Sequence, residues 1–204
     1  MSEKELTTIE PIQNGTGASV KPERPNTGKK EFTNVRLLAN SVSNRMNNII
    51  ATNVVIAIGS RVQGQKCEIY VNDMPVKLDA KHICYPDVVV VSGEPQFVDR
   101  ESDMLLNPTV AFDIFSKNTS FQDKTEKLEC YLAMASIREY ILIKEDEMRV
   151  EHYAKQNAKQ WVYKIYNERD DVISIDSINC KISSAEIYAQ VKFASGEVKA
   201  QATS

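Results

Sequence analysis

The sequence lacks the segments that would carry it into or across a membrane. Its first residues, MSEKELTTIEPIQNG, contain no apolar core behind a basic start, which a secretory signal requires. No stretch approaches the roughly 20 consecutive apolar residues that a membrane-spanning helix needs. We therefore expect a cytoplasmic protein.

The sequence also lacks the paired cysteines and histidines of common zinc sites. Four cysteines are spread along the chain without a CxxC pair: Cys67, Cys84, Cys130 and Cys180. This distribution predicts reduced thiols in a reducing compartment. The two histidines, His82 and His152, have no metal-ligand spacing, and we interpret both as surface residues.

An excess of positive charge is missing as well. Acidic residues outnumber basic ones by 28 to 25, so the chain lacks the strong positive field of proteins that bind nucleic acid mainly through its backbone charge. Any surface that binds DNA must then be local. The length of 204 residues and the hydrophobic content of 42% are enough for one domain with a real core.

Composition divides the chain into three parts. Residues 1–30 are rich in Thr, Pro, Gly, Asn, Lys and Glu, which cannot offset the entropy of ordering, and this predicts a flexible N-terminal arm. The folded domain is expected over residues 31–194, followed by a C-terminal tail over residues 195–204.

Apolar spacing predicts the first helix between Phe32 and about Ile50. Apolar residues recur there at three or four positions: Val35, Leu38, Val42 and Met46. The following β-branched run, Val54 to Gly59, is either a short strand or a continuation of this helix, because periodicity does not separate the two.

The remaining pattern predicts an α/β sandwich, a mixed sheet flanked by helices. Strands are expected over residues 67–71, 74–78, 87–91, 109–115 and 139–143, with a hairpin formed by residues 149–153 and 161–166. Helices are expected from about Ser120 to Met134 and near Ser184 to Val191.

Two aspartates lie where apolar residues would be expected. Asp113 is inside the strand-like run Val110 to Phe115, and Asp87 opens a strand of four valines. A buried carboxylate costs several kcal/mol unless it is paired, hydrogen-bonded or bound to a cation. Two acids on adjacent core strands can meet at one point, and paired oxygen ligands with open positions suit Mg²⁺. The pattern therefore predicts a metal site.

Each aspartate also has a simpler interpretation. Asp87 could be an ordinary carboxylate at a strand start after Pro86. Asp113 could face solvent on a half-exposed strand, but alternation then places Phe115 on the same face, which argues against exposure.

The helix after Asp113 carries Asp123, Lys127 and Tyr131, which are spaced by four and lie on one helical face. If this face covers the strand ends, the Lys127 ammonium can orient or help to deprotonate an attacking water and offset charge on a phosphate. Lys127 could instead form an exposed pair with Asp123. Tyr131 is expected to pack in the core with its hydroxyl directed towards the site. Glu139 is expected to pair with Arg138 or to cap a strand end.

Four ordered blocks resemble the Uma-type (Uma-two) restriction endonuclease family of the PD-(D/E)XK nuclease superfamily. They read YPDVVV, LNPTVAFDIFS, DKTEKL and SIREYIL, and cover parts of residues 85–142. The resemblance extends over about residues 65–193 and implies a restriction-endonuclease-like core. It also implies that Asp87 and Asp113 bind metal, and that the lysine of the superfamily motif has moved to Lys127 on the helix, since Phe115 occupies the usual position.

The sequence departs from the family pattern at two places. The family usually has Glu at position 113, and upstream a Glu followed by Gly and then a His that opens the first helix, where this chain has Phe32-Thr33-Asn34.

Two functions follow from these observations. The first is a Mg²⁺-dependent endonuclease that hydrolyses DNA, with Asp87, Asp113 and Lys127 as catalytic residues. The sequence leaves open whether two copies form a homodimer to cut both strands. The alternative is a catalytically degenerate member of the same fold that binds DNA or protein.

Overall fold

The computed structural model describes residues 36–37, 44–99, 103–116 and 121–193. The predicted arm over residues 1–30 and the predicted tail over residues 195–204 lie outside these ranges. So does most of the segment where the first helix was expected to begin. In the described ranges, no helix is both long and apolar enough to cross a membrane.

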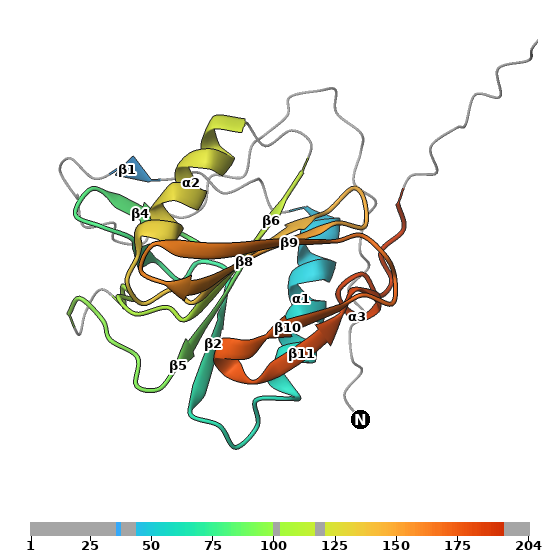
Figure 1. Ribbon diagram of the computed structural model, residues 1–204, viewed down its shortest axis with the longest axis horizontal. Coiled ribbons are helices and arrows are strands. Elements are labelled where there is room, and N and C mark those ends of the chain that lie inside the picture. The colour runs from blue at the N-terminus through green and yellow to red at the C-terminus, as the bar shows by residue number, and fades with distance from the viewer. Residues whose placement is uncertain (1–35, 38–43, 100–102, 117–120, 194–204) are drawn as a thin grey trace, which may run out of the picture. The chain divides into compact units, whose positions relative to one another are not determined.

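The fold is a mixed α/β arrangement, as predicted, in which helices flank a large sheet (Figure 1). In the described part of the chain this sheet has six strands in the order β2-β5-β6-β7-β8-β9. The strands β6 and β7 are parallel, and the other neighbours are antiparallel. The bounds are β2 Cys67–Val71, β5 Val88–Ser92, β6 Val110–Phe115, β7 Glu139–Lys144, β8 Val150–Asn157 and β9 Gln160–Tyr166.

Alternating side chains divide the central strands between two apolar clusters. Val88 and Val90 of β5 pack with α1 (Arg45–Gly59), whereas Val89 and Val91 pack with α2 (Phe121–Ala133) on the opposite face. The sheet is therefore buried on both faces, which explains why β5 is an unbroken valine run.

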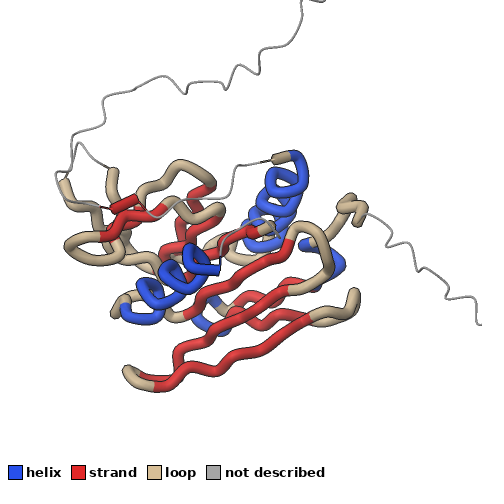
Figure 2. The backbone as a smooth tube through the Cα atoms, turned by 90° about the horizontal axis from the view of Figure 1, so that it is seen from above, coloured by secondary structure: helices blue, strands red, loops and turns tan. Residues whose placement is uncertain are grey.

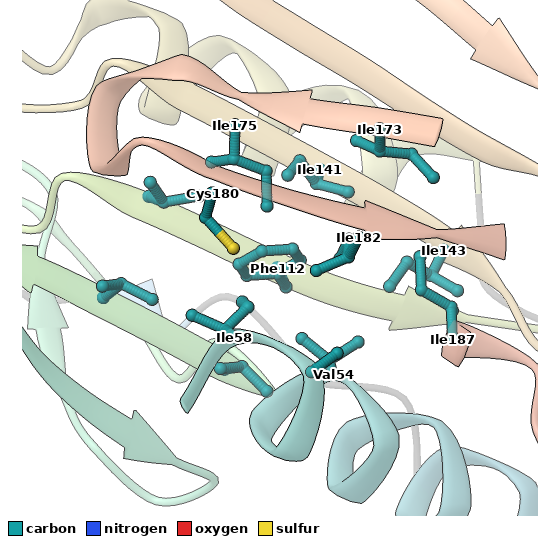
Figure 3. Close-up of a cluster of buried hydrophobic side chains, with 14 of the residues drawn as sticks. Val54, Ile58, Phe112, Ile141, Ile143, Ile173, Ile175, Cys180, Ile182 and Ile187 are labelled. Atoms are coloured by element: carbon teal, nitrogen blue, oxygen red, sulfur yellow. The ribbon is translucent and has the colours of Figure 1, made fainter. Parts of the chain in front are cut away.

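Phe112 is central to the cluster on the α1 face (Figure 3). Its ring lies between α1, represented by Val54 and Ile58, and the two-stranded sheet of β10 (Val172–Ile175) and β11 (Cys180–Ser183). The 3₁₀ turn η1 (Asp176–Ile178) joins these two strands, and α3 (Ser184–Ile187) follows them and adds Ile187 to the cluster. Apolar burial from three separate segments thus fixes one face of β6.

The opposite face carries α2 and a small sheet with strand order β1-β4-β3 (Figure 2). Its strands are β1 (Arg36–Leu37), β3 (Val76–Lys77) and β4 (His82–Cys84). Val76 and Cys84 pack in the same cluster as Tyr131 of α2.

The first helix begins later than predicted. Arg36 and Leu37 form a strand, and α1 begins at Arg45, after the N-cap Asn44 whose side chain accepts hydrogen bonds from the backbone N–H groups of Met46 and Asn47. The capping side chain satisfies donors that would otherwise have no partner, so the helix can begin there. The run from Val54 to Gly59, for which the sequence allowed a strand or a helix, is helical and forms the last part of α1.

Candidate active site

The two aspartates meet where β5 begins and β6 ends. Asp87 directly precedes β5, which pairs with β6 in antiparallel register with Val88 opposite Phe112. The backbone N–H of Asp87 donates to the carbonyl of Phe112 over 3.0 Å. Asp87 therefore lies beside the segment that carries Asp113, and both carboxylates are buried, with exposed fractions of 6% and 4%.

Asp113 accepts one hydrogen bond at each carboxylate oxygen. The Lys127 ammonium lies 2.8 Å from Oδ1, and the Tyr140 hydroxyl donates to Oδ2 over 2.7 Å. Because β6 and β7 are parallel with Asp113 opposite Leu142, Tyr140 projects from the same face of the sheet. The pairing with Lys127 is a buried ion pair, since both side chains are less than a tenth exposed.

Asp87 is held by α1 and by β6. The side-chain amide of Asn47 donates to Oδ1 over 3.1 Å, and the backbone N–H of Ile114 donates to Oδ2 over 2.6 Å. These donors come from different elements, so the carboxylate is placed only when α1 is docked on the sheet.

Burial and neighbouring charges shift the pKa values of Asp87 and Lys127. Burial, together with the negative charge of Asp113, raises the pKa of Asp87 to about 6, although the hydrogen bonds from Ile114 and Asn47 oppose this change. For Lys127, burial favours the neutral amine, but the adjacent Asp113 outweighs it and raises the pKa above its usual value. Lys127 is therefore a cation at neutral pH.

The site has more negative than positive charge and has carboxylate lone pairs that are still available to a cation. Among the residues that the structure describes, Lys127 supplies one positive charge against the two carboxylates of Asp87 and Asp113. Each carboxylate has about four lone-pair positions and uses two of them in the contacts above. Buried hard oxygen ligands with an unbalanced negative charge fit a divalent cation such as Mg²⁺.

Two buried tyrosines, Tyr131 and Tyr140, lie beside the ion pair of Asp113 and Lys127. The rings of Tyr131 and Tyr140 stack with a centroid distance of 4.4 Å, and the hydroxyl of Tyr131 lies 2.8 Å from Cys84 Sγ. Burial raises the pKa of both tyrosines well above the usual value, so both hydroxyls remain protonated. Tyr140 therefore acts as a hydrogen-bond donor to Asp113 across the neutral pH range.

Comparison with known families identifies the chain. A family model described as "Putative restriction endonuclease" and named Uma2 matches residues 22–186, most of the sequence. The chain belongs to the Uma2 family. Among the relatives of this Uma2 member is "Uncharacterized protein sll1609" of Synechocystis sp., 28% identical over 141 residues, or 69% of this chain and 80% of that protein. Another Synechocystis sp. relative, "Uncharacterized protein slr1290", is 21% identical over 167 residues, 81% of this chain and 86% of its own.

A solved structure shares the fold of this Uma2 family member. It is described as "a putative nuclease belonging to DUF820" from Anabaena variabilis. The similarity has a TM-score of 0.60 at 17% identity and covers 75% of this chain and 86% of the other. At this identity the likeness concerns the fold.

Within the Uma2 fold, Asp87, Asp113 and Lys127 lie together, as the sequence predicted. Lys127 is 7% exposed and contacts Asp113, so its alternative as a solvent-exposed side chain is wrong. The solvent-facing alternative for Asp113 is also wrong. The Tyr131 hydroxyl is directed to Cys84. The side chain of Asp123 lies outside the described residues.

Sequence reasoning missed Asn47 and Tyr140, which complete the site of this Uma2 member. A signal for Asn47 was present, because it precedes Ile50 and Val54 at helical spacing and so extends the buried stripe of α1 with a polar residue. Tyr140 carried a weaker signal, since its place in an apolar strand is equally typical of core packing.

Two predictions for charged residues outside the site are wrong. His152 is buried, and its Nε2 lies 2.6 Å from Glu139 Oε2. Glu139 therefore pairs with His152 from β8 and accepts from the Ser177 backbone N–H, not with Arg138. His82 is half-buried and contacts Asp79. The contact between Glu139 and His152 arises from the pairing of β7 with β8, whereas Asp79 and His82 are three residues apart in one turn.

Proposed function

We propose that the chain is a Mg²⁺-dependent endonuclease that hydrolyses DNA phosphodiester bonds. The observation that supports this most directly is the buried pair of carboxylates, Asp87 and Asp113, whose negative charge is only half balanced by Lys127. Membership of the Uma2 family favours the same class of reaction, and so does the solved structure with this fold, which is described as a nuclease.

The chain's own residues would divide the work. Asp87 and Asp113 would hold the metal, which supplies a Lewis acid for the phosphate and lowers the pKa of a bound water. Lys127 would orient the attacking water and stabilise the charge that develops on the phosphate oxygens. Tyr140 and Asn47 would fix the two carboxylates in position through the hydrogen bonds described above.

A small basic surface at the rim supports a nucleic-acid substrate. Lys124 lies over the ring of Phe115, two residues after Asp113, with its ammonium 4.4 Å from the ring centroid. Lys124 and Arg149 both contact the carboxylate of Glu151, at 3.0 Å and 3.1 Å, so this group of three side chains holds two cations and one anion. A local patch of this kind can attract a phosphate backbone although the chain is acidic as a whole.

A second candidate function is a degenerate family member that binds DNA or protein without cleavage. The specific observation in its favour is that all four carboxylate oxygens of Asp87 and Asp113 already accept hydrogen bonds from the chain. Such a site is satisfied without a cation.

A plasmid-cleavage assay with Mg²⁺ or EDTA separates the two candidates. We expect the wild type to nick or linearise DNA with Mg²⁺, and Asp87→Asn and Lys127→Met to lose at least about 100-fold in rate. Matched controls are Asp170→Asn and Lys159→Met, which change the same residue types at exposed positions. Wild-type protein that binds DNA in a gel-shift assay but never cuts it would favour the degenerate candidate.

A further inference from the structure

A second group of metal-ligand side chains lies between the β3–β4 turn and α2. Asp79, His82 and Cys130 each offer one ligand atom, and these atoms all lie within 4.8 Å of one another. We call these three residues the His82–Cys130 cluster. None of them belongs to the group formed by Asp87, Asp113 and Lys127.

The β3–β4 turn positions the first two members of the cluster. Asp79 Oδ1 accepts hydrogen bonds from the backbone N–H groups of Lys81 at 2.6 Å and His82 at 2.9 Å, which fixes the turn. Asp79 Oδ2 lies 2.8 Å from His82 Nδ1 and holds the imidazole ring. A carboxylate against one ring nitrogen is the arrangement that orients histidine ligands in metal sites.

The helix α2 supplies the other side of the cluster. Cys130 and Glu126 are four residues apart and therefore lie on one helical face. Glu126 Oε1 is 3.8 Å from His82 Nε2, the ring nitrogen remote from Asp79. The imidazole of His82 is thus placed between a carboxylate of the turn and a carboxylate of the helix.

The donor set selects the class of ion. One thiol, one imidazole and carboxylate oxygens match the ligands of Zn²⁺, whereas Mg²⁺ prefers oxygen alone. The carboxylates of Asp79, Glu126 and Glu129 act electrostatically on the Cys130 thiol, and this negative field would attract a cation.

We propose that the His82–Cys130 cluster binds Zn²⁺ or a similar borderline-soft divalent cation, beside Glu126, whose Oε1 lies 3.8 Å from His82 Nε2. This cation would join the β3–β4 turn to α2 at Cys130, three residues after Lys127. It would therefore stabilise the helix that carries the lysine of the active site, independently of any Mg²⁺ bound there.

Titration with Co²⁺, a spectroscopic substitute for Zn²⁺, tests this proposal. Full-length reduced protein in excess Mg²⁺ should develop a near-ultraviolet thiolate-to-Co²⁺ charge-transfer band with visible bands of tetrahedral Co²⁺, and added Zn²⁺ should remove them. Cys130→Ser should abolish the charge-transfer band. His82→Gln and Asp79→Asn should weaken Co²⁺ affinity at least about tenfold.

Two matched variants serve as controls. Cys67→Ser changes the other half-buried cysteine, which begins β2, and should keep the full band. Asp87→Asn removes the proposed Mg²⁺ ligand and should keep it too. No charge-transfer band in the wild type, or a band that survives Cys130→Ser, would overturn the proposal. The same holds if Asp79→Asn and His82→Gln bind Co²⁺ as tightly as the wild type.

Discussion

Asp87 is an acid of the candidate site whose ionisation is strongly affected by its surroundings. Its pKa rises from 3.8 to about 6, first because burial disfavours the charged carboxylate and second because Asp113 is negative. The folded protein therefore binds a proton at Asp87 more tightly than the unfolded chain. The stabilisation from protonated Asp87 is complete below about pH 4 and is lost as the pH rises through about 6.

This linkage predicts how Asp87→Asn changes stability with pH. The free energy of unfolding of the variant, relative to wild type, should rise by roughly 3 kcal/mol between about pH 4 and about pH 7, because Asn has no charge to lose. Urea denaturation in EDTA at several pH values measures it. A difference that stays constant with pH would mean that Asp87 is solvated like an ordinary carboxylate.

The buried pair of Asp113 and Lys127 predicts non-additive substitutions. Asp113→Asn leaves a buried ammonium without its partner at 2.8 Å and should lower the free energy of unfolding by about 3–5 kcal/mol. The double variant Asp113→Asn, Lys127→Met should recover much of this loss, because it removes the buried ammonium that the single variant leaves without its partner.

A double-mutant cycle by chemical denaturation measures this coupling. Half-buried Lys144 and exposed Glu147, 2.7 Å apart at i,i+3, provide a control pair that should couple by less than about 1 kcal/mol. Equal coupling in both pairs would contradict the buried ion pair as a structural element.

At the scale of elements, the start of α1 links helix capping to the site. Asn44 caps the first turn through contacts of 2.8 Å to the Met46 N–H and 3.1 Å to the Asn47 N–H. Asn47 lies in that turn and donates to Asp87. Loosening of the turn would therefore release one of the donors that position the carboxylate.

We expect Asn44→Ala to lower stability by about 1 kcal/mol and also to weaken Mg²⁺ binding. Ser183→Ala is the matched control, since Ser183 caps α3 with a capping box and contacts neither aspartate. It should cost a similar amount of stability and leave Mg²⁺ affinity unchanged. Calorimetric Mg²⁺ titration of the two variants distinguishes them. If Asn44→Ala and Ser183→Ala bind Mg²⁺ with equal affinity, the cap of α1 has no influence on the site.

The sequence predicted most of the long elements and also the short strand β3 and the short helix α3, but it missed other short strands. The strands β2, β5, β6, β7, β8 and β9 and the helix α2 were found with small differences in their bounds. The short strands β4, β10 and β11 were missed because three or four residues carry too little periodicity. The N-cap Asn44 was overlooked because Val35, Leu38 and Val42 before it have helical spacing in the sequence.

At the scale of the whole molecule, Phe112 and Asp113 are neighbours in sequence that serve opposite faces of the sheet. Phe112 is fully buried between α1 and β10–β11 (Figure 3), whereas the carboxylate of Asp113 contacts Lys127 of α2 on the opposite face. One face of β6 therefore contributes Phe112 to the core, and the other face contributes Asp113 to the candidate site.

Phe112→Ala should therefore destabilise the fold by about 3–5 kcal/mol, because it leaves a cavity where three segments meet. The half-buried Phe97, which packs against the other cluster, is the control and should cost less when changed to Ala. Thermal and urea denaturation give both values. A loss below about 1 kcal/mol for Phe112→Ala would mean that the α1 face can close around the cavity.

The sequence by itself determined that Asp87 and Asp113 are out of place in apolar strands, because an unpaired buried carboxylate is too costly to occur by chance. It also determined that Lys127 lies on the helix that follows. Only the tertiary structure decided which groups donate hydrogen bonds to these two carboxylates. Asn47 and Tyr140 lie 40 and 27 residues along the chain from the aspartates that they contact. Contacts across a sheet depend on strand order and register, which local residue patterns do not specify.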